Sequence, residues 1–325
     1  MRVAVIGAGG RQKTEASIVR ALCALGHEGR LVDAVAWARY AGRLSGRAAR
    51  YLTDAFQPDF LILTRHAIEL GESSLRALLR GRRGVFWYFD LHPKEKVVAL
   101  GRLVGTMYVT SHGQIDSYRA AGIAEVRFLP QGVDPEWDVP AVSAPASLTC
   151  DASFVGSGQY PHRYPPLRAV ASVSRLEIRG PGWSAAPRDL PVVGGPVHGA
   201  ELARVIRGAA ISLGANAYPE QDTEPASASN RMWKILGCGG FYLGPRVPDI
   251  ESFAAGGRHC AWYGDAADAA EQVRHYLSRP DERARIAWAG REHALRHHTY
   301  AHRLTLLLEG REYQVGRSTA PHTIR

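Results

Sequence analysis

The chain has 325 residues, of which 46% are hydrophobic and 22% charged, as in soluble proteins with one or two globular domains. Its net charge is +9, and no segment approaches the ~20 consecutive apolar residues of a membrane-spanning helix. The apolar stretch before Gly7 is too short for a secretory signal, and the four cysteines lack metal-type spacing, so we expect a cytoplasmic protein with reduced thiols.

Strand and helix patterns alternate along the first half of the chain. Apolar runs predict strands at 2–6, 29–33, 60–63, 85–89, 106–110 and 126–130, and apolar periodicity predicts helices at 13–25 and 113–121. Strands separated by helices in this way predict a parallel, doubly wound α/β sheet.

A Pro-, Ala- and Ser-rich segment between 135 and 150 has the composition of a linker. A second series follows it, with strands at 152–158, 175–180, 209–213 and 240–243 and helices near 267–277 and 281–293. We therefore expect an N-terminal domain at 1–140, a C-terminal domain at 148–313 and a disordered tail at 314–325.

The positive charge is concentrated in the first half. Residues 1–135 hold 19 Lys+Arg and 12 Asp+Glu, a net of +7, whereas the remainder holds 21 and 19, a net of +2. Such a distribution suits a polyanionic or acidic partner, although a solvated basic surface gives the same pattern.

The segment 229–243 predicts a short helix followed by a strand. Ser229 and Asn230 place a polar helix start where backbone N–H groups and the helix dipole favour an anion. Arg231 and Lys234 are three residues apart and share one helical face, so both can reach the same phosphates. Gly239 and Gly240 then allow a tight exit and close approach of a ligand, although an ordinary glycine cap is the alternative.

The turn after the first strand contains part of a dinucleotide-binding motif. Gly7, Gly9 and Gly10 are present, but Gln12 stands where the last glycine of that motif belongs. A tight βα turn explains these residues, and in a two-domain enzyme Gly9 and Gly10 are still expected at a ligand cleft.

Several motifs in succession resemble glycosyltransferases of GT-B fold, closest to the group 1-like branch that includes spore-maturation-type proteins. The motifs are at 132–135, 153–157, 179–183, 229–240 and 298–303. The resemblance implies two tandem Rossmann-like domains facing across a cleft, and transfer of a sugar from a nucleotide-diphosphate sugar, with UDP-sugars favoured, without a metal or other cofactor.

The resemblance places the nucleotide-sugar donor on the second domain. It implies that Gly156, Ser157 and Gly158 face the diphosphate, that Gly182 and Trp183 flank the nucleobase, and that the donor also contacts Ser229, Asn230, Arg231, Lys234, Gly239 and Gly240. Many relatives carry two glutamates eight positions apart, where this chain has Ala226 and Lys234. Lysine at that position favours phosphate contact, and Glu224 or Asp222 is a candidate substitute for the ribose contact.

Catalytic residues are expected on the first domain. Asp90 directly follows an apolar strand, where a carboxylate can accept the proton of an acceptor hydroxyl, and His92 can orient or replace it. A role for Asp90 as a turn or helix-cap residue is the alternative, and His112 is a further candidate for which a loop hydrogen bond is the preferred interpretation. No Asp-x-Asp metal signature is present.

The acceptor is predicted from the charge of the first domain. DNA carrying hydroxymethylated pyrimidines fits, because base-glycosylating enzymes of bacterial viruses share the GT-B fold and reaching the base requires contacts to phosphates. The expected contacts are Arg76, Arg80, Arg82 and Arg83, although an exposed helix end is the preferred interpretation of these residues.

Three other functions compete with this prediction. The acceptor can instead be a cell-surface glycan, a protein or a small metabolite. The missing glutamate pair also fits a non-catalytic nucleotide-sugar sensor. A nicotinamide oxidoreductase is disfavoured by Gln12 and by the apparent lack of an acidic partner for the ribose.

Overall fold

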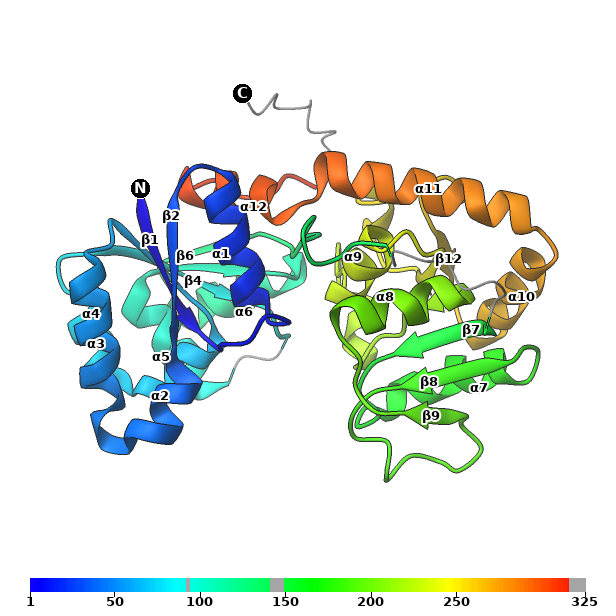
Figure 1. Cartoon of the computed structure of the whole chain (residues 1–325), viewed down its shortest axis with the longest axis horizontal. Helices are drawn as coiled ribbons and strands as arrows, with labels where there is room; N and C mark the ends of the chain where they lie inside the picture. The colour runs from blue at the N-terminus through cyan, green and yellow to red at the C-terminus, as the bar shows by residue number, and fades with distance from the viewer. Residues whose placement is uncertain (92–93, 141–148, 316–325) are drawn as a thin grey trace. The chain divides into compact units, whose positions relative to one another are not determined.

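The computed structural model describes residues 1–91, 94–140 and 149–315. Its contacts divide the chain into two units, one formed by Met1–Gln131 together with Tyr300–Gln314 and the other by Gly132–Thr299 (Figure 1). Each unit holds one six-stranded sheet in which every strand pair is parallel. The predicted tandem Rossmann-like architecture is confirmed.

The sheet of the first unit has the order β2-β1-β3-β4-β5-β6. Its strands are β1 (Arg2–Gly7), β2 (Glu28–Asp33), β3 (Phe60–Leu63), β4 (Arg83–Tyr88), β5 (Thr106–Val109) and β6 (Glu125–Phe128). All four residues of β3 are buried, as the continuous apolar run predicts for a strand covered on both faces.

Helices connect these strands and cover the sheet. They are α1 (Thr14–Ala24), α2 (Ala34–Ala41), α3 (Ser45–Phe56), α4 (Glu72–Leu79), α5 (Glu95–Val104) and α6 (Ile115–Ala120), with the 3-10 turns η1 (Gly42–Leu44), η2 (Arg65–Leu70) and η3 (His112–Gln114). The last helix of the chain, α12 (Tyr300–Leu308), packs against α1 in the same unit (Figure 1). The sequence interpretation had assigned this helix to the second domain.

The second unit has the sheet order β12-β11-β10-β7-β8-β9. Its strands are β7 (Cys150–Val155), β8 (Leu176–Arg179), β9 (Val192–Gly194), β10 (Ala209–Leu213), β11 (Tyr242–Pro245) and β12 (Ala261–Tyr263). Its helices are α7 (Tyr164–Ala171), α8 (Gly199–Gly208), α9 (Asn230–Gly237), α10 (Ala266–Leu277) and α11 (Pro280–His297), with the turns η4 (Pro161–Arg163), η5 (Pro219–Asp222) and η6 (Ile250–Ser252).

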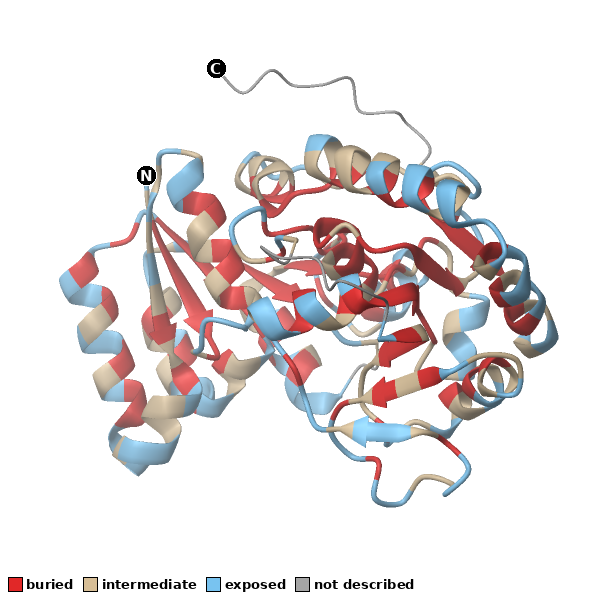
Figure 2. Ribbon diagram, turned by 45° about the vertical axis from the view of Figure 1, so that its right-hand side comes forward, coloured by how far each residue is buried: buried red, intermediate tan, exposed pale blue. Residues whose placement is uncertain are grey.

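Burial follows the sheets in both units (Figure 2). In the second unit a continuous core joins apolar residues of β7, β8, β10 and β11 with the inner faces of α7 and α10. Among the described residues no helix has the length and apolar character needed to cross a bilayer. Most of the predicted linker and nearly all of the predicted tail lie outside the described residues.

Candidate functional site

The carboxyl ends of β7 and β8 in the second unit are joined by closely packed glycines. Gly180 has a φ of +143°, and a Cβ on it would collide with the backbone of Gly156. The indole Nε1 of Trp183 donates to the Gly156 carbonyl over 2.9 Å, and its ring lies where a Cβ on Gly158 would be. Because Trp183 is buried, its ring supports the loop that contains Gly156 and Gly158 from inside the protein. The residues predicted from the glycine motifs are thus brought together.

Arg231, the first basic residue of α9, lies across these strand ends. Its Nε donates to the Val155 carbonyl over 2.8 Å and its Nη1 to the Ala215 carbonyl over 3.3 Å, and its guanidinium lies 4.4 Å from the centre of the Phe154 ring. Burial lowers the pKa of Arg231. The predicted cation is therefore fixed by two carbonyls and one aromatic ring.

A second arginine, which the sequence interpretation missed, packs beside it. Arg163 is 9% exposed, its Nη1 donates to the Ser157 carbonyl over 2.7 Å, and its guanidinium lies 5.7 Å from the centre of the Phe154 ring. Burial, together with the charge of Arg231, lowers the pKa of Arg163 to about 9. Among the described residues neither guanidinium has a carboxylate within 4.0 Å. Two cations without a carboxylate partner at strand ends are chemically suited to a polyanion.

A cavity of about 230 Å³ adjoins Arg231. Its wall combines the glycine turns, the 196–198 segment, one face of α8 and the first turns of α9, including Gly156, Gly180, Pro181, Val197, Leu202, Asn230 and Lys234. Helix α9 starts there without a side-chain cap from Ser229, and the buried Oδ1 of Asn230 has no hydrogen-bond partner within the described chain. An apolar cavity with convergent polar groups beside two cations suits a nucleotide.

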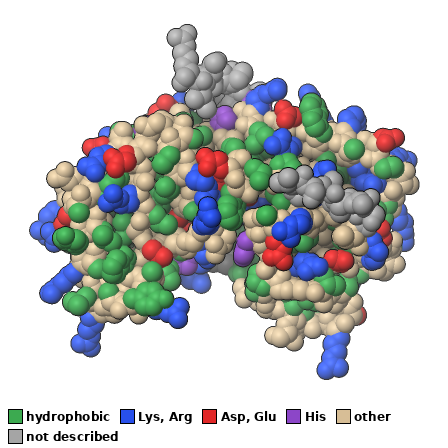
Figure 3. All heavy atoms as spheres, viewed as in Figure 1, with side chains coloured by type: hydrophobic (Ala, Val, Ile, Leu, Met, Phe, Trp, Pro, Cys, Tyr) green, Lys and Arg blue, Asp and Glu red, His purple; other side chains and the backbone are tan. Residues whose placement is uncertain are grey.

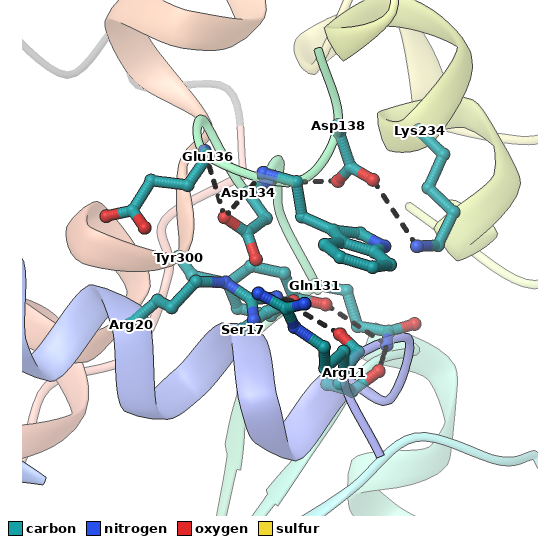
Figure 4. Close-up of polar contacts among 11 residues, drawn as sticks. Arg11, Ser17, Arg20, Gln131, Asp134, Glu136, Asp138, Lys234 and Tyr300 are labelled. Carbon is teal, nitrogen blue, oxygen red and sulfur yellow. Dashed lines mark hydrogen bonds and ion pairs between the residues drawn. The ribbon is translucent and has the colours of Figure 1, made fainter. Parts of the chain in front are cut away.

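Lys234 lines this cavity and is also ion-paired. Its Nζ lies 3.4 Å from Oδ1 of Asp138, whose side chain is 3% exposed and also accepts the backbone N–H of Asp134 over 3.0 Å (Figure 4). Burial raises the pKa of Asp138, and the charge of Lys234 acts in the opposite direction. Lys234 thus has a buried partner that its sequence neighbours do not reveal.

The two glycines after α9 lie away from the cavity. Gly239, with a φ of +72°, ends the helix, and a Cβ on Gly240 would collide with Ile206 of α8. An eight-residue helix is about 12 Å long, so these glycines lie that far from Ser229 at its start. Gly239 and Gly240 therefore serve the ending and the packing of helix α9, and neither glycine lines the cavity.

In the first unit Asp90 follows β4 at the carboxyl edge of the sheet. Its Oδ2 accepts a short hydrogen bond from Nη1 of Arg65, which follows β3. Nη2 of Arg65 lies 3.2 Å from Nε2 of His66, and because a guanidinium only donates, Nε2 must be the unprotonated nitrogen. Burial, and next the charge of Arg65, lower the pKa of His66. Arg65 and His66 were missed because they lie 24 residues or more from Asp90 in the sequence.

Other predicted residues of this unit are His92, His112, Gly9 and Gly10. His92 lies outside the described residues. His112 is exposed in η3, with its ring edge-on to Phe128 at 5.5 Å. The turn with Gly9 and Gly10 packs against Asp33, since a Cβ on Gly9 would collide with that carboxylate.

Asp33 also corrects one step of the sequence interpretation. It ends β2, which is where dinucleotide-binding folds place the acidic residue that holds the ribose. The acidic residue is therefore present, but its Oδ1 accepts the N–H of Ala36 over 2.9 Å and caps α2. Gln12 remains the departure from the dinucleotide motif.

The four arginines predicted to bind the acceptor lie elsewhere in the unit. Arg83 begins β4, and Arg80 and Arg82 lie in the turn before it, so these three occupy the amino edge of the sheet, opposite Asp90. Arg82 donates to Asp54 over 2.6 Å, and Arg76 pairs with Glu72 one helical turn away. Ligands of such sheets bind at the carboxyl edge, so this placement does not suit acceptor contacts.

Comparisons with known proteins agree with the fold. A family model described as glycosyl transferase-like matches residues 164–309. No curated protein matches the chain. An α-glucosyltransferase solved with UDP-glucose and DNA containing an abasic site is similar over 95% of this chain and 98% of its own, with a TM-score of 0.70 and 10% identity.

Two further solved structures have the same architecture. Anabaena HepE with UDP and glucose has a TM-score of 0.66 and 12% identity over 95% of this chain and 99% of its own. Sucrose-phosphate synthase from Thermosynechococcus elongatus has a TM-score of 0.67 and 13% identity over 95% of this chain and 98% of its own. The chain therefore has the GT-B fold of these glycosyltransferases, and residues 164–309, less than half of its length, match the glycosyl transferase-like family.

Proposed function

We propose that the protein transfers a sugar from a UDP-sugar to a hydroxyl acceptor. The main support is the pair Arg163 and Arg231 at the carboxyl ends of the second sheet. Neither guanidinium has a carboxylate partner among the described residues. The donor diphosphate neutralises both, and the nucleoside occupies the adjoining cavity. HepE, which shares the fold, was solved with UDP-glucose, which supports a UDP donor here.

The chemistry follows from where charge develops. As the bond between the sugar and the diphosphate breaks, negative charge grows on the diphosphate, and fixed cations stabilise the transition state more than the ground state. The uncapped start of α9 and Asn230 add donors on the same side of the cavity. Because Ala226 and Lys234 replace the glutamate pair of many relatives, Lys234 contacts a phosphate or the ribose through its ammonium group.

Asp90 serves as the general base of an inverting reaction in this proposal. Its carboxylate accepts the proton of the acceptor hydroxyl while that oxygen attacks the anomeric carbon. Arg65 holds the carboxylate in place through the observed ion pair, which leaves its other oxygen for the acceptor. His66, unprotonated at Nε2, extends the same polar cluster.

The proposed acceptor is a hydroxymethylated pyrimidine base in DNA. Support comes from the net charge of +7 on residues 1–135, and from two solved α-glucosyltransferase complexes, one with DNA containing an HMU base and one with DNA containing an abasic site. A surface glycan, a protein or a small metabolite is the competing acceptor. The basic charge distribution favours the nucleic acid over these.

One experiment separates these possibilities. Plain and hydroxymethylated DNA are incubated with the protein and mixed nucleotide sugars, followed by mass spectrometry of the digested bases and measurement of released nucleotide diphosphate. A hexose mass on the hydroxymethylated base alone is expected, and it should vanish in Arg231→Ala. Release of UDP without modified DNA would move the acceptor to another class. Donor binding without any release would identify a nucleotide-sugar sensor.

A further inference from the structure

The exposed apolar side chains of the first unit are concentrated on one short segment. Nine large hydrophobic residues are exposed in the described chain, and four of them, Val35, Tyr40, Leu44 and Tyr51, lie within 17 residues of sequence. Tyr40 is 77% exposed and Tyr51 73%. Clusters of exposed apolar side chains of this kind mark interaction surfaces.

The same segment is strongly basic. Residues 34–56 contain four arginines and one acidic residue, Asp54. Arg50 pairs with Asp54 at 3.3 Å, but Arg39, Arg43 and Arg47 have no carboxylate within 4.0 Å among the described residues. The guanidinium of Arg39 lies 5.5 Å from the centre of the Tyr40 ring. These three cations are exposed and available to an anionic partner.

Helical spacing within η1 and α3, and the contact of α2 with both, bring these side chains close together. Leu44 and Ser45, at the junction of η1 and α3, both have αR backbone angles, so the helical path of η1 continues into α3, whereas Gly42, with φ of +50° and ψ of −121°, separates it from α2. Arg43 and Leu44 lie three or four positions before Arg47, and Tyr51 lies four after it, so these side chains are neighbours along η1 and α3. Arg39 and Tyr40 belong to α2, which contacts both η1 and α3. Gly46 faces away from them, because a Cβ on it would collide with Ser74 of α4. We call this surface the α2–α3 patch: Arg39, Tyr40, Arg43, Leu44, Arg47 and Tyr51.

The start of the patch is at the carboxyl edge of the first sheet. Helix α2 begins directly after Asp33 at the end of β2, and it packs against η2, which carries Arg65 and His66. In Figure 3 basic side chains project beside hydrophobic ones at the lower left, where Figure 1 places α2 and α3. The patch therefore adjoins the edge that holds Asp90, unlike Arg80 and Arg83 at the opposite edge.

We propose that the α2–α3 patch is the surface through which the protein holds DNA, with its arginines on phosphates and its tyrosines against bases or sugars. This inference rests on the proposed DNA acceptor. Arginine is suited to phosphate oxygens through its planar fork, and aromatic rings provide stacking surfaces for bases exposed outside the duplex. A lipid surface suits the patch less, because Leu44 is its one aliphatic side chain whereas interfacial helices present a broad apolar face.

The test compares two variants that remove the same charge. Arg39→Ala/Arg43→Ala/Arg47→Ala deletes three cations from the patch, and the control Arg76→Ala/Arg80→Ala/Arg83→Ala deletes three from elsewhere in the same unit. Binding of a fluorescent 20-base-pair duplex is measured by anisotropy across a salt series. We expect the patch variant to lower the slope of log K against log salt by about 2.7, from 0.9 for each of three phosphates, and the control to bind like the wild type.

Several results would overturn the inference. These are absence of duplex binding by the wild type at low salt, an unchanged slope in the patch variant, or an equal loss in the control. Binding to vesicles of phosphatidylglycerol and phosphatidylcholine without binding to the duplex would assign the patch to a lipid surface instead. Circular dichroism melting of each variant identifies any that fails to fold, and Tyr40→Ala/Tyr51→Ala, which keeps every charge, is then expected to weaken binding without changing the slope.

A separate measurement tests the proposed function. Titration of UDP-glucose into the patch variant should give the wild-type affinity, since the patch belongs to the first unit and the proposed donor site to the second. If the wild type binds the duplex through the patch but does not bind UDP-glucose, the proposed donor fails and the DNA surface stands. If the wild type binds UDP-glucose but not the duplex, the proposed donor stands and the DNA surface fails.

Discussion

Replacing Arg163 by methionine should make the ligand-free protein as stable as the wild type or more stable, while weakening UDP binding. The pKa of Arg163 falls from 12.5 to about 9 because of burial and the neighbouring Arg231. At ~1.4 kcal/mol per tenfold change in the equilibrium, the folded protein disfavours this cation by about 5 kcal/mol.

Two interactions of Arg163 offset part of that cost. The hydrogen bond from Nη1 to the Ser157 carbonyl contributes about 1.5–3 kcal/mol as a charged hydrogen bond. The guanidinium also lies 4.6 Å from the centre of the Tyr160 ring, which contributes about 0.5–2 kcal/mol. Methionine keeps most of the packing and removes the charge, so the net gain in stability is about 0–3 kcal/mol.

Binding changes in the opposite direction. Loss of one buried cation that contacts the diphosphate should weaken UDP affinity by about 2–4 kcal/mol, or roughly 30- to 1,000-fold. Urea unfolding measures the stability, and isothermal titration with UDP measures the affinity. The matched control is Arg168→Met on α7, whose exposed pair with Asp189 should contribute little to stability and nothing to binding. A large loss of stability with unchanged UDP affinity would falsify the assignment and make Arg163 a structural residue.

Three further predictions concern single sites. Asp90→Asn should keep UDP affinity but lower turnover by roughly 10²–10⁴-fold, measured as UDP release with acceptor present, and a near-normal rate would remove Asp90 as the base. Lys234→Met should lower the free energy of unfolding by about 2–4 kcal/mol, because it leaves the buried Asp138 without its cation. The double variant Lys234→Met/Asp138→Asn should recover most of that loss in urea unfolding. An equal loss in both variants would contradict the pairing. Burial, followed by the charge of His293, lowers the pKa of His259 to about 4, and the neutral Nδ1 of His259 accepts the backbone N–H of Ala255 over 3.2 Å. The contribution of His259 to stability is therefore complete above about pH 6.5 and is lost as the pH falls toward 4. Melting temperatures measured from pH 7 to 4 should fall less in His259→Phe than in the wild type, and parallel curves would refute the linkage.

Local patterns were sufficient to predict parallel α/β sheets in both halves of the chain, although the strands β9 and β12 were not predicted. The apolar runs at 60–63 and 209–213 coincide with β3 and β10, because strands buried on both faces need continuous hydrophobic sequence. The polar start of α9 and the position of Arg231 at the strand ends also follow from sequence, since the glycine turns and the helix start lie at the same sheet edge in a parallel fold.

Contacts between distant segments could not be predicted in this way. Arg163 joins Arg231 only because β7 and β10 are neighbours in the sheet, and Lys234 meets Asp138 across 96 residues of sequence. The four arginines between 76 and 83 were assigned to the acceptor by charge alone, and charge does not say which edge of the sheet a turn occupies. Helices α2 and α3 were not predicted, because the buried face of α3 consists mainly of small residues such as Gly46, Ala49 and Thr53, and the one buried residue of α2 is Ala34.

The return of α12 to the first unit has a consequence for how the protein is made. Residues 1–131 leave the ribosome first, yet Arg303 of α12 donates to the Gln131 carbonyl and α12 covers α1. The first unit therefore cannot complete its packing until the whole second unit has been synthesised, which reverses the usual order in which N-terminal domains mature first. A fragment ending near 131 should be aggregation-prone, and a soluble version of that unit would need 300–314 attached to it through a short engineered loop.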